Sequence, residues 1–361
     1  MFIKKLMLIN YRNYEKLNIN FGKGVNVFIG DNAQGKTNIL EGIYYCAFAR
    51  SHRTSKDREL INWNNHEAYI SLGIAKERLD KKIDIKILKD GKKAIKVNSI
   101  KINKIGELFG IFNVVMFSPE DLKIVKDSPG VRRRFIDMEL CQLNKKYYYN
   151  IVQYNKVLNE RNVVLKNRNL SEDMLDVYDE QLSSYGEYVI KERLKYIDKL
   201  NHYGKKVHKD ITSNKENIEF KYQSTIKDLS KVKENFYEAL KKNRKKDIEK
   251  GISTIGPHRD DFSIFINNVD IKSFGSQGQQ RTAVLTIKFA SLRIIKEITN
   301  EYPVLLLDDV LSELDFSRKR YILSTIGEIQ TIITCTGIED ICNYLDSNSK
   351  IFKVKNGIVS N

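Results

Sequence analysis

The segment GDNAQGKT, from Gly30 to Thr37, has the residue types and spacing of a loop that binds nucleotide phosphates. It fits the pattern G-x-x-x-x-G-K-[ST], in which glycines let backbone amides turn toward the phosphates. Lys36 is expected to reach the β- and γ-phosphate oxygens, and the Thr37 hydroxyl to ligate Mg²⁺. The residues predicted to surround the nucleotide are Gly30, Asp31, Asn32, Ala33, Gln34, Gly35, Lys36 and Thr37.

A second chemical signal is the segment PVLLLDDV, residues 303–310, in which an aliphatic run ends in two carboxylates. Burying adjacent acids at a strand end is costly unless a cation receives them. The Mg²⁺ of a phosphate-binding loop does so, and we therefore predict Asp308 as a metal ligand. Asp309 is then placed to accept a proton from the attacking water, which makes it the predicted catalytic residue.

A third segment, SFGSQGQQR at residues 273–281, reads as another phosphate-binding loop. Gly275 and Gly278 precede an apolar stripe of helical spacing, and a helix N-terminus attracts anions. One nucleoside triphosphate cannot easily fill two such loops in one compact domain. We therefore predict a dimer in which this loop faces the nucleotide of the partner subunit.

These segments need strands and helices to position them, and the pattern of the chain supplies both. Apolar alternation or apolar runs predict strands in MFIKKLMLINY, LNINFGKGVNVFIG, YISLGIAKE, KKIDIKILKDGKKAIKVNS, IFNVVMF, FSIFINNVDI, TIITCT and IFKVKNGIV. Asp90 and Gly91 form the predicted turn of a hairpin. Between the strands of the first third and those of the last third, helical spacing predominates from Val131 to the basic cluster at 241–251. We interpret this cluster first as a solvated helix end and second as a DNA contact. We predict an α/β domain made of 1–120 and 251–361, interrupted by a helical insertion at 121–250.

The composition indicates a protein of the cytoplasm with a polyanionic partner. The net charge of +16 lies in the first two thirds of the chain, which favours nucleic acid, although a biased genome could also produce a lysine-rich chain. The four cysteines form no C-x-x-C pair, which argues against a disulfide framework or a zinc site. We see no signal peptide and no apolar run long enough for a membrane span, so no membrane association is expected.

Taken in order, the motifs resemble those of the ABC-type ATPase heads of the SMC group, and within it the RecF family of bacterial recombination mediators. Beyond the phosphate loop, the likeness is carried by RSHRTSKDRELI (50–61), FSPEDLKIVKDSPGVRRRFID (117–137), GPHRDDF (256–262), GSQGQQRT (275–282) and LLLDDVLSELD (305–315). The resemblance implies an ABC-type P-loop ATPase head with an inserted, mostly helical lid domain.

The resemblance also implies an activity. It describes an ATP-dependent homodimer that binds DNA where single and double strands meet at gaps and helps RecO and RecR load recombinase. It further implies roles in DNA repair, replication restart and SOS induction. ATP hydrolysis would be weak, DNA-stimulated and used as a switch rather than a motor.

Carried over by position, the resemblance assigns further residues to the nucleotide. Ser276, Gln277, Gly278 and Gln279 would form the signature that contacts the partner subunit's ATP, and Ser312, Glu313, Leu314 and Asp315 the D-loop. An ordinary helix N-cap at Ser312 explains the latter segment equally well.

The chain departs from the wider ABC pattern in three places. Asp309 stands where most heads have a glutamate, which fits a slow base. TIITCTG has no switch histidine, so Thr334 or Thr336 is expected to serve in part, and residues 119–121 are the candidate for the Q-loop.

Basic residues near these motifs are candidate DNA or nucleotide contacts. Arg50 and Arg53 follow the helix after the phosphate loop, where a salt-bridged helix end is the alternative. Arg132, Arg133 and Arg134 are expected to meet phosphates, since three successive arginines cannot all point into a core. The segment GPHRDD, with His258 and Arg259, reads as a structural turn or as a nucleotide contact.

Two other functional classes remain as alternatives. A P-loop kinase acting on a small substrate would share the phosphate loop, but it has no use for a dimerising signature loop. A transporter ATPase subunit would share more of the motifs, but the missing switch histidine and the basic, strand-rich first third count against it.

Overall fold

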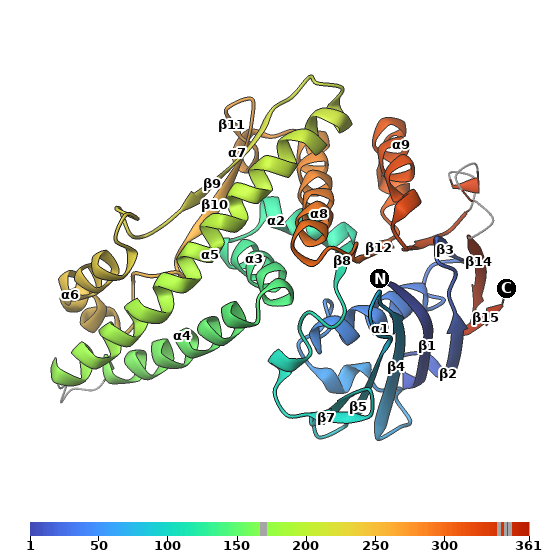
Figure 1. The fold of residues 1–361 in the computed structure, drawn as a ribbon, viewed down its shortest axis with the longest axis horizontal. Helices are drawn as coiled ribbons and strands as arrows, with labels where there is room; N and C mark the ends of the chain where they lie inside the picture. The colour runs from blue at the N-terminus through green and yellow to red at the C-terminus, as the bar shows by residue number, and fades with distance from the viewer. Residues whose placement is uncertain (167–171, 338–340, 343–344, 346–348, 361) are drawn as a thin grey trace. The chain divides into compact units, whose positions relative to one another are not determined.

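The computed structural model describes the chain except for residues 167–171, 338–340, 343–344, 346–348 and 361 (Figure 1). Its strands form two six-stranded sheets and one three-stranded sheet. The predicted strands are confirmed, including the hairpin turn, where Gly91 has a φ of 85° and its N–H donates to the Leu88 carbonyl over 2.9 Å.

The largely parallel sheet carries the predicted acidic strand, β12 (Val304–Asp308), beside its edge strand β8 (Val114–Phe117). Its strands, in order across the sheet, are β15 (Ile358–Ser360), β14 (Lys350–Lys355), β3 (Val25–Ile29), β13 (Thr331–Cys335), β12 (Val304–Asp308) and β8 (Val114–Phe117). All of them pair in parallel except β14 with β15. Every residue of β12 is buried, as expected for an internal strand of a parallel sheet. Because β3 and β12 run in the same direction, the phosphate loop and the acidic pair both lie at the carboxyl ends of the parallel strands.

The other six-stranded sheet is antiparallel throughout and comes from the N-terminal part of the chain. Its strands, in order, are β2 (Tyr14–Asn20), β1 (Phe2–Tyr11), β4 (Glu67–Ala75), β5 (Lys81–Leu88), β6 (Lys93–Val97) and β7 (Ile100–Ile102). Helix α1 (Lys36–Phe48) contacts β4 and β5 of this sheet and β8, β12 and β13 of the parallel sheet. The helix is therefore apolar around most of its circumference, which is typical of a helix enclosed on several sides.

The chain divides into two compact units, which are described separately. The first comprises Met1–Asp121, Asp210–Ser213 and Leu285–Asn361, and the second Leu122–Lys209 and Asn214–Val284. Residues 251–284 therefore cluster with the helical insertion, whereas the sequence pattern assigned them to the ATPase domain. The reason is strand pairing: β10 (Asp261–Ile266) pairs with β9 (Ile218–Gln223) inside the insertion, a strand that the sequence analysis did not predict.

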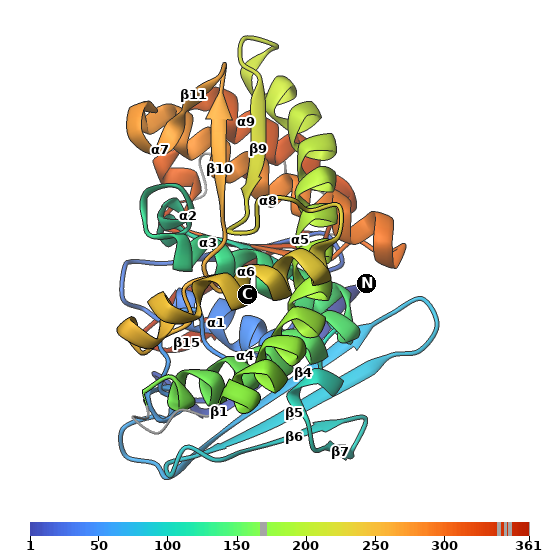
Figure 2. The ribbon, with the colours of Figure 1, turned by 90° about the vertical axis from the view of Figure 1, so that its left-hand side faces the viewer.

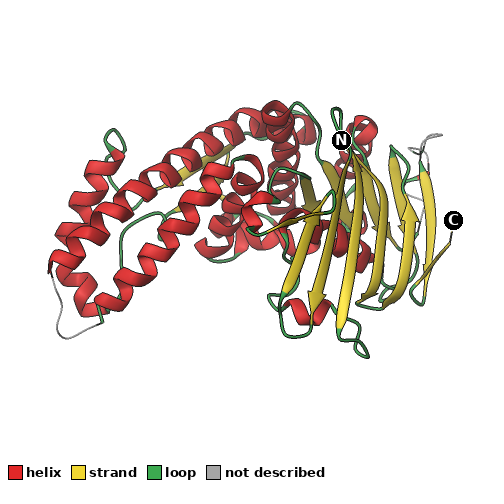
Figure 3. Cartoon of the chain, turned by 60° about the horizontal axis from the view of Figure 1, so that its bottom comes forward, coloured by secondary structure: helices red, strands yellow, loops and turns green. Residues whose placement is uncertain are grey.

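Helices dominate the second unit, in red in Figure 3. They are α2 (Lys123–Lys126), α3 (Pro129–Leu143), α4 (Lys145–Val164), α5 (Glu172–Thr212), α6 (Val232–Lys250) and α7 (Ile271–Phe274), and the last residues of α5 belong to the first unit. The antiparallel strands β9, β10 and β11 (Val269–Asp270) complete it, and Figure 2 shows β9 beside β10. The division between the units passes through α8 (Gln277–Thr299), and the first unit also contains α9 (Phe316–Thr325). Short 3₁₀ helices are η1 (Asp57–Leu60), η2 (Ile105–Glu107), η3 (Pro119–Leu122), η4 (Leu311–Glu313) and η5 (Ile326–Glu328).

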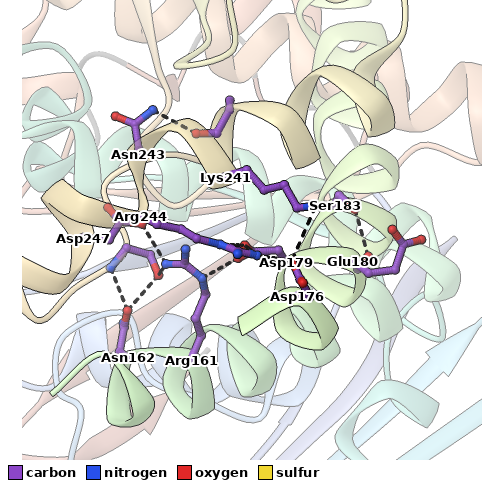
Figure 4. Close-up of polar contacts among 12 residues, drawn as sticks. Arg161, Asn162, Asp176, Asp179, Glu180, Ser183, Lys241, Asn243, Arg244 and Asp247 are labelled. Carbon is purple, nitrogen blue, oxygen red and sulfur yellow. Dashed lines mark hydrogen bonds and ion pairs between the residues drawn. The ribbon is translucent and has the colours of Figure 1, made fainter. Parts of the chain in front are cut away.

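A buried ionic cluster joins α4, α5 and α6 (Figure 4). The fully buried guanidinium of Arg161 donates from Nε to Asp179 over 2.7 Å and from Nη1 to Asp247 over 2.8 Å. Arg244 also binds Asp179, over 2.7 Å, and the basic cluster at 241–251 is thus the solvated end of α6 with one arginine turned inward. A buried charge that loses its partner is strongly destabilising, so this cluster fixes how the three helices pack.

Among the described residues, no helix is both long and apolar enough to cross a membrane.

Candidate nucleotide site

The predicted phosphate loop joins β3 to α1, and its two glycines are required by close contacts. Gly35 precedes the first turn of α1 with a φ of 110°, and a Cβ there would lie 2.4 Å from the Asn13 side-chain nitrogen. A Cβ on Gly30 would lie 2.2 Å from the carbonyl oxygen of Val354 in β14. The neighbouring backbone and side chains therefore leave room only for glycine at both positions.

Lys36 lies at the start of α1 and turns back across the loop. Its Nζ donates to the carbonyl oxygens of Gly30 over 2.5 Å and of Asp31 over 2.8 Å, and its side chain is largely buried. The ammonium is thus held on the inner side of the loop, between its first residues and the helix N-terminus. This is the position from which a lysine neutralises bound phosphate oxygens.

The two predicted magnesium ligands come together at the edge of the parallel sheet. The Thr37 hydroxyl donates to Asp308 Oδ1 over 2.9 Å, and the Thr334 hydroxyl donates to the same oxygen over 2.8 Å. Asp308 is buried, whereas Asp309 is half-exposed and has a φ of 52°. A hydroxyl and a carboxylate side by side are the oxygen ligands that Mg²⁺ takes beside nucleotide phosphates, so these residues fit the ion.

Thr334 contacts both acidic residues. Besides its bond to Asp308, its hydroxyl accepts the backbone N–H of Asp309 over 3.0 Å, and its carbonyl oxygen accepts the same N–H over 3.2 Å. Thr334 is fully buried, whereas Thr336 is exposed. Of the two threonines named as substitutes for the switch histidine, the structure brings Thr334 to the acidic pair.

A set of residues that the sequence analysis missed supports the phosphate loop from the turn between β1 and β2. Asn13 Nδ2 donates to the Gln34 carbonyl over 3.1 Å, and Asn13 Oδ1 accepts from Asn38 Nδ2 over 2.8 Å. The Tyr14 hydroxyl donates to the Gly35 carbonyl over 3.1 Å. No motif marks these residues, because they are brought to the loop by strand pairing rather than by sequence spacing.

A buried carboxylate supports the same helix from beneath. Glu41 of α1 accepts two bonds from the Arg12 guanidinium, each over 2.8 Å, and one from the Ser51 hydroxyl over 2.5 Å. Although burial opposes the change, these bonds from Arg12 and Ser51 lower the pKa of Glu41. Glu41 therefore stays charged and holds the turn between β1 and β2 against α1.

The arginines that follow α1 fall into two environments. Arg53 donates to Asn38 Oδ1 over 3.0 Å and lies 3.9 Å from Glu41, so the alternative of a salt-bridged helix end holds for it. Arg50 is exposed, and among the described residues it has no ion-pair partner. Arg50 stays a candidate contact for a phosphate.

Of the three candidate phosphate contacts at 132–134, Arg132 points into the core of the second unit. Its guanidinium is buried and forms a two-pronged ion pair with Asp261, over 2.7 and 2.8 Å, inside the second unit. Arg133 donates to the Asp260 carbonyl over 2.7 Å, and Arg134 is exposed. A helix in contact with a sheet turns successive side chains in different directions, and here one of the three finds a carboxylate in the core.

The segment GPHRDD is a structural turn of the second unit. His258 bonds from Nδ1 to the Tyr154 hydroxyl over 2.7 Å and from Nε2 to the Ser253 carbonyl over 3.0 Å. Arg259 donates to the same carbonyl, and Asp260 accepts from the Tyr222 hydroxyl over 2.7 Å. These bonds favour the structural interpretation of His258 and Arg259.

The signature segment begins α8 with a reciprocal cap. The Ser276 hydroxyl accepts the N–H of Gln279 over 3.2 Å, while the Gln279 side-chain oxygen accepts the N–H of Ser276 over 3.0 Å. Gln279 Nε2 also donates to Glu216 over 2.9 Å. Ser276 and Gln277 are exposed and Gly278 is half-buried.

In the D-loop segment, Ser312 is not the N-cap of the following helix. The Ser312 hydroxyl donates back to the Asp309 carbonyl over 2.9 Å, and residues 311–313 form a 3₁₀ turn. Asp315 caps α9 instead, accepting the N–H of Arg318 over 3.0 Å. The cap therefore lies three residues later than proposed, and Ser312 is tied to the predicted catalytic residue.

Comparisons with known proteins agree on one family. The family model described as "RecF/RecN/SMC N terminal domain" matches residues 2–360. Among similar proteins, a "DNA replication and repair protein RecF" of Clostridium perfringens is 70% identical over 357 residues, or 99% of each chain. One of Clostridium botulinum is 69% identical over 361 residues, or 100% of each chain.

Solved structures extend the likeness to three dimensions. The chain is similar to the "recombination mediator protein RecF-ATP in RecFOR pathway", with a TM-score of 0.91 at 37% identity over 99% of this chain and 97% of that one. An SMC head bound to a domain of ScpA matches with a TM-score of 0.59 at 16% identity, over 100% and 96% of the two chains, which shows the fold alone. The predicted fold class, an ABC-type ATPase head, is confirmed.

Proposed function

Because the chain belongs to the RecF family of DNA replication and repair proteins, we propose that it is an ATP-dependent, DNA-binding recombination mediator. Two copies close around ATP, bind gapped DNA where single and double strands meet, and act with RecR and RecO to load recombinase. In the cell, this activity would serve DNA repair, replication restart and SOS induction in the cytoplasm.

The observation that carries the proposal is the hydroxyl–carboxylate pair at the mouth of the phosphate loop. Thr37 and Asp308 lie 2.9 Å apart although 271 positions separate them in the chain. Such a pair has a clear use in a nucleotide site, where Mg²⁺ bridges phosphate oxygens and protein oxygens. The similarity to an ATP-bound RecF structure supports ATP as the nucleotide.

The residues around this pair have separate roles in hydrolysis. When bound, Mg²⁺ supplies charge stabilisation to the phosphate oxygens. Lys36 neutralises the same phosphates, and Thr37 and Asp308 hold the ion. Asp309 accepts the proton of the attacking water. A carboxylate one methylene shorter than glutamate holds its oxygens farther back, which fits slow turnover used as a switch.

The signature loop completes the site from the partner subunit. Ser276 is exposed at the start of α8, where backbone N–H groups and the helix dipole favour an anion. Ser312 and the rest of the D-loop would lie at the same interface. ATP would then be contacted by the phosphate loop of one copy and by the signature of the other.

The test separates nucleotide binding from dimerisation. Lys36→Met should lose binding of a fluorescent ATP analogue, measured by anisotropy. Ser276→Arg should keep that binding but lose ATP-dependent dimerisation in sizing chromatography, together with ATP turnover. Ser276→Thr, which keeps the hydroxyl, is the matched control and should dimerise. Equal loss of nucleotide binding in the Lys36 and Ser276→Arg variants would overturn the assignment of the signature to the partner's ATP.

DNA binding needs its own measurement. With ATP, the wild-type protein should bind a gapped duplex more tightly than without it, and the affinity should fall steeply with salt because phosphate contacts release counterions. Phosphorylation of a small acceptor would instead support the kinase alternative. No feature of the described residues favours that alternative.

A further inference from the structure

The chain has a single tryptophan, and it lies on the surface. Trp63 is 96% exposed in the turn between η1 and β4. An indole is a large, flat, apolar surface that is normally covered in a folded protein. Trp63 lies outside the phosphate-loop motif, and the proposed nucleotide site does not require an aromatic residue at position 63.

Hydrogen bonds hold the tryptophan turn in one conformation. The N–H of Asn62 donates to the Asn10 carbonyl over 2.9 Å, and its side-chain nitrogen donates to the Arg12 carbonyl over 3.0 Å. The N–H of Asn65 closes the turn onto the Asn62 carbonyl over 2.9 Å. Arg12 is itself fixed by Glu41, so the indole projects from a braced support and little conformational entropy is lost when a ligand covers it.

Exposed cations surround this turn. Lys56 and Arg58 precede it, and Lys89 lies beside it, because the Lys89 N–H donates to the His66 carbonyl over 3.0 Å. Within the described part of the chain, none of these three cations has a carboxylate within ion-pair distance. The acids adjacent to these cations in the chain have other partners. Asp57 is paired with Lys93 over 2.8 Å and Asp90 with Lys92 over 3.2 Å, and the Glu59 carboxylate accepts from the Thr54 hydroxyl over 2.5 Å.

The surroundings decide which kind of partner fits. A protein-binding tryptophan typically lies in a rim of other contacts that exclude water, with apolar anchors nearby. Here the neighbours are the amides Asn64 and Asn65 and unpaired cations, a combination that suits a polyanion with flat rings. Proteins bind single-stranded nucleic acid in this way, with bases stacked on aromatic side chains and phosphates held by Lys and Arg.

We propose that Trp63 is a stacking site for an unpaired base of single-stranded DNA, with Lys56, Arg58 and Lys89 contacting the flanking phosphates. The inference rests on the proposed DNA-binding function and adds the residue that distinguishes single strands from duplex. In a duplex, the base faces are covered by their neighbours in the stack, so Trp63 has no face to stack on. Phosphate contacts, in contrast, are available in both.

The single tryptophan makes a direct test possible, because all tryptophan emission of the full-length protein comes from Trp63. Titration with a single-stranded thymidine oligonucleotide should quench that emission to saturation. The midpoint should equal that of binding measured independently by anisotropy of a dye-labelled strand. A duplex of the same length should bind with far less quenching.

Two variants give the energetic test. Trp63→Ala should weaken single-strand binding by about 5- to 150-fold, the range expected for loss of one stacked base. Its binding of duplex DNA and of the fluorescent ATP analogue should not change, since Trp63 contacts neither. Trp63→Tyr keeps an aromatic face and should retain most of the single-strand affinity.

The possible outcomes are distinguishable. If the wild-type protein binds single strands without quenching, or Trp63→Ala binds them normally, the stacking site is overturned while DNA binding stands. Quenching by a protein partner but not by DNA would point to the other class of ligand and also overturn it. Failure of the wild-type protein to bind any DNA would overturn the proposed function and the stacking site together.

Discussion

Replacing Thr334 with valine should uncouple the two acidic residues of the site. Valine has nearly the same shape, so the change removes only the hydroxyl. That hydroxyl donates to the charged Asp308 over 2.8 Å, a bond of about 1.5–3 kcal/mol. The bond to the Asp309 N–H matters less, because the Thr334 carbonyl oxygen still accepts that N–H over 3.2 Å. We expect the substitution to remove about 2–3 kcal/mol of the interaction free energy that holds Asp308 and Asp309 in position.

The assay is steady-state ATP turnover in the presence of DNA. A loss of about 2–3 kcal/mol in transition-state stabilisation lowers kcat/KM by about 30- to 150-fold. Because Thr334 acts through Asp308, the apparent affinity for Mg²⁺ should weaken as well, and excess Mg²⁺ should restore part of the activity. A purely structural role would lower the melting temperature without changing the Mg²⁺ dependence.

Thr336→Val is the matched control. Thr336 follows the same strand but is exposed, and we expect turnover and Mg²⁺ dependence close to those of the wild type. The reasoning would be refuted if Thr334→Val kept full turnover, or if Thr336→Val had the larger effect. In the second case, the threonine outside the buried cluster would be the functional substitute for the switch histidine.

Three further substitutions test other parts of the structure. Gly30→Ala should abolish binding of the fluorescent ATP analogue, because its Cβ would lie 2.2 Å from the Val354 carbonyl oxygen and force β14 or the loop to move. Arg161→Met should lower the free energy of unfolding in urea by about 3–5 kcal/mol, since it leaves the buried Asp247 without a cation; a loss below about 1 kcal/mol would contradict the packing role of the cluster. Burial lowers the pKa of His258 to about 4, below its ordinary value near 6.5, so between these values the unfolded chain binds a proton that the folded chain does not. Stability should therefore be complete above pH 6.5 and fall by up to about 3 kcal/mol toward pH 4, and the unfolding free energy of His258→Gln should lack that part of the pH dependence.

Local patterns predicted the strands and the phosphate loop because each is decided over a few residues. β12 is recognisable as an unbroken aliphatic run, and Gly30 to Thr37 as a fixed spacing. The extent of the insertion differs from the prediction for the opposite reason. The pairing of β9 with β10 joins segments about 40 positions apart, and β9, IEFKYQ, alternates regularly but over only six residues inside a largely helical block.

Within the site, the acidic pair also shows that local sequence patterns predict only part of the arrangement. Its two carboxylates could be assigned from their position after a strand, and the structure places Asp308 against Thr37 as expected. Alternation along a strand does not decide which threonine reaches them, because Thr334 and Thr336 are two residues apart and share a face. The choice depends on where β13 ends, at Cys335, and on its pairing with β12, which sets Thr334 beside Asp308. The position of Arg132 was equally hard to predict, since its carboxylate partner lies 129 positions further along the chain.

The reciprocal cap at the start of α8 leaves hydrogen-bond donors of the signature available to bind a phosphate. A hydroxyl has one donor and two acceptor positions, so Ser276 can accept the N–H of Gln279 and still donate its proton to a phosphate oxygen. The Gln279 side chain is held at both of its polar atoms, because its oxygen accepts the Ser276 N–H and one N–H of its nitrogen donates to Glu216. Its nitrogen still has a second N–H, so Gln279 can also donate to a phosphate without breaking either bond. Both side chains can therefore keep the helix start intact and bind a phosphate of the proposed ATP-bound pair, and of the two Ser276 is the exposed one.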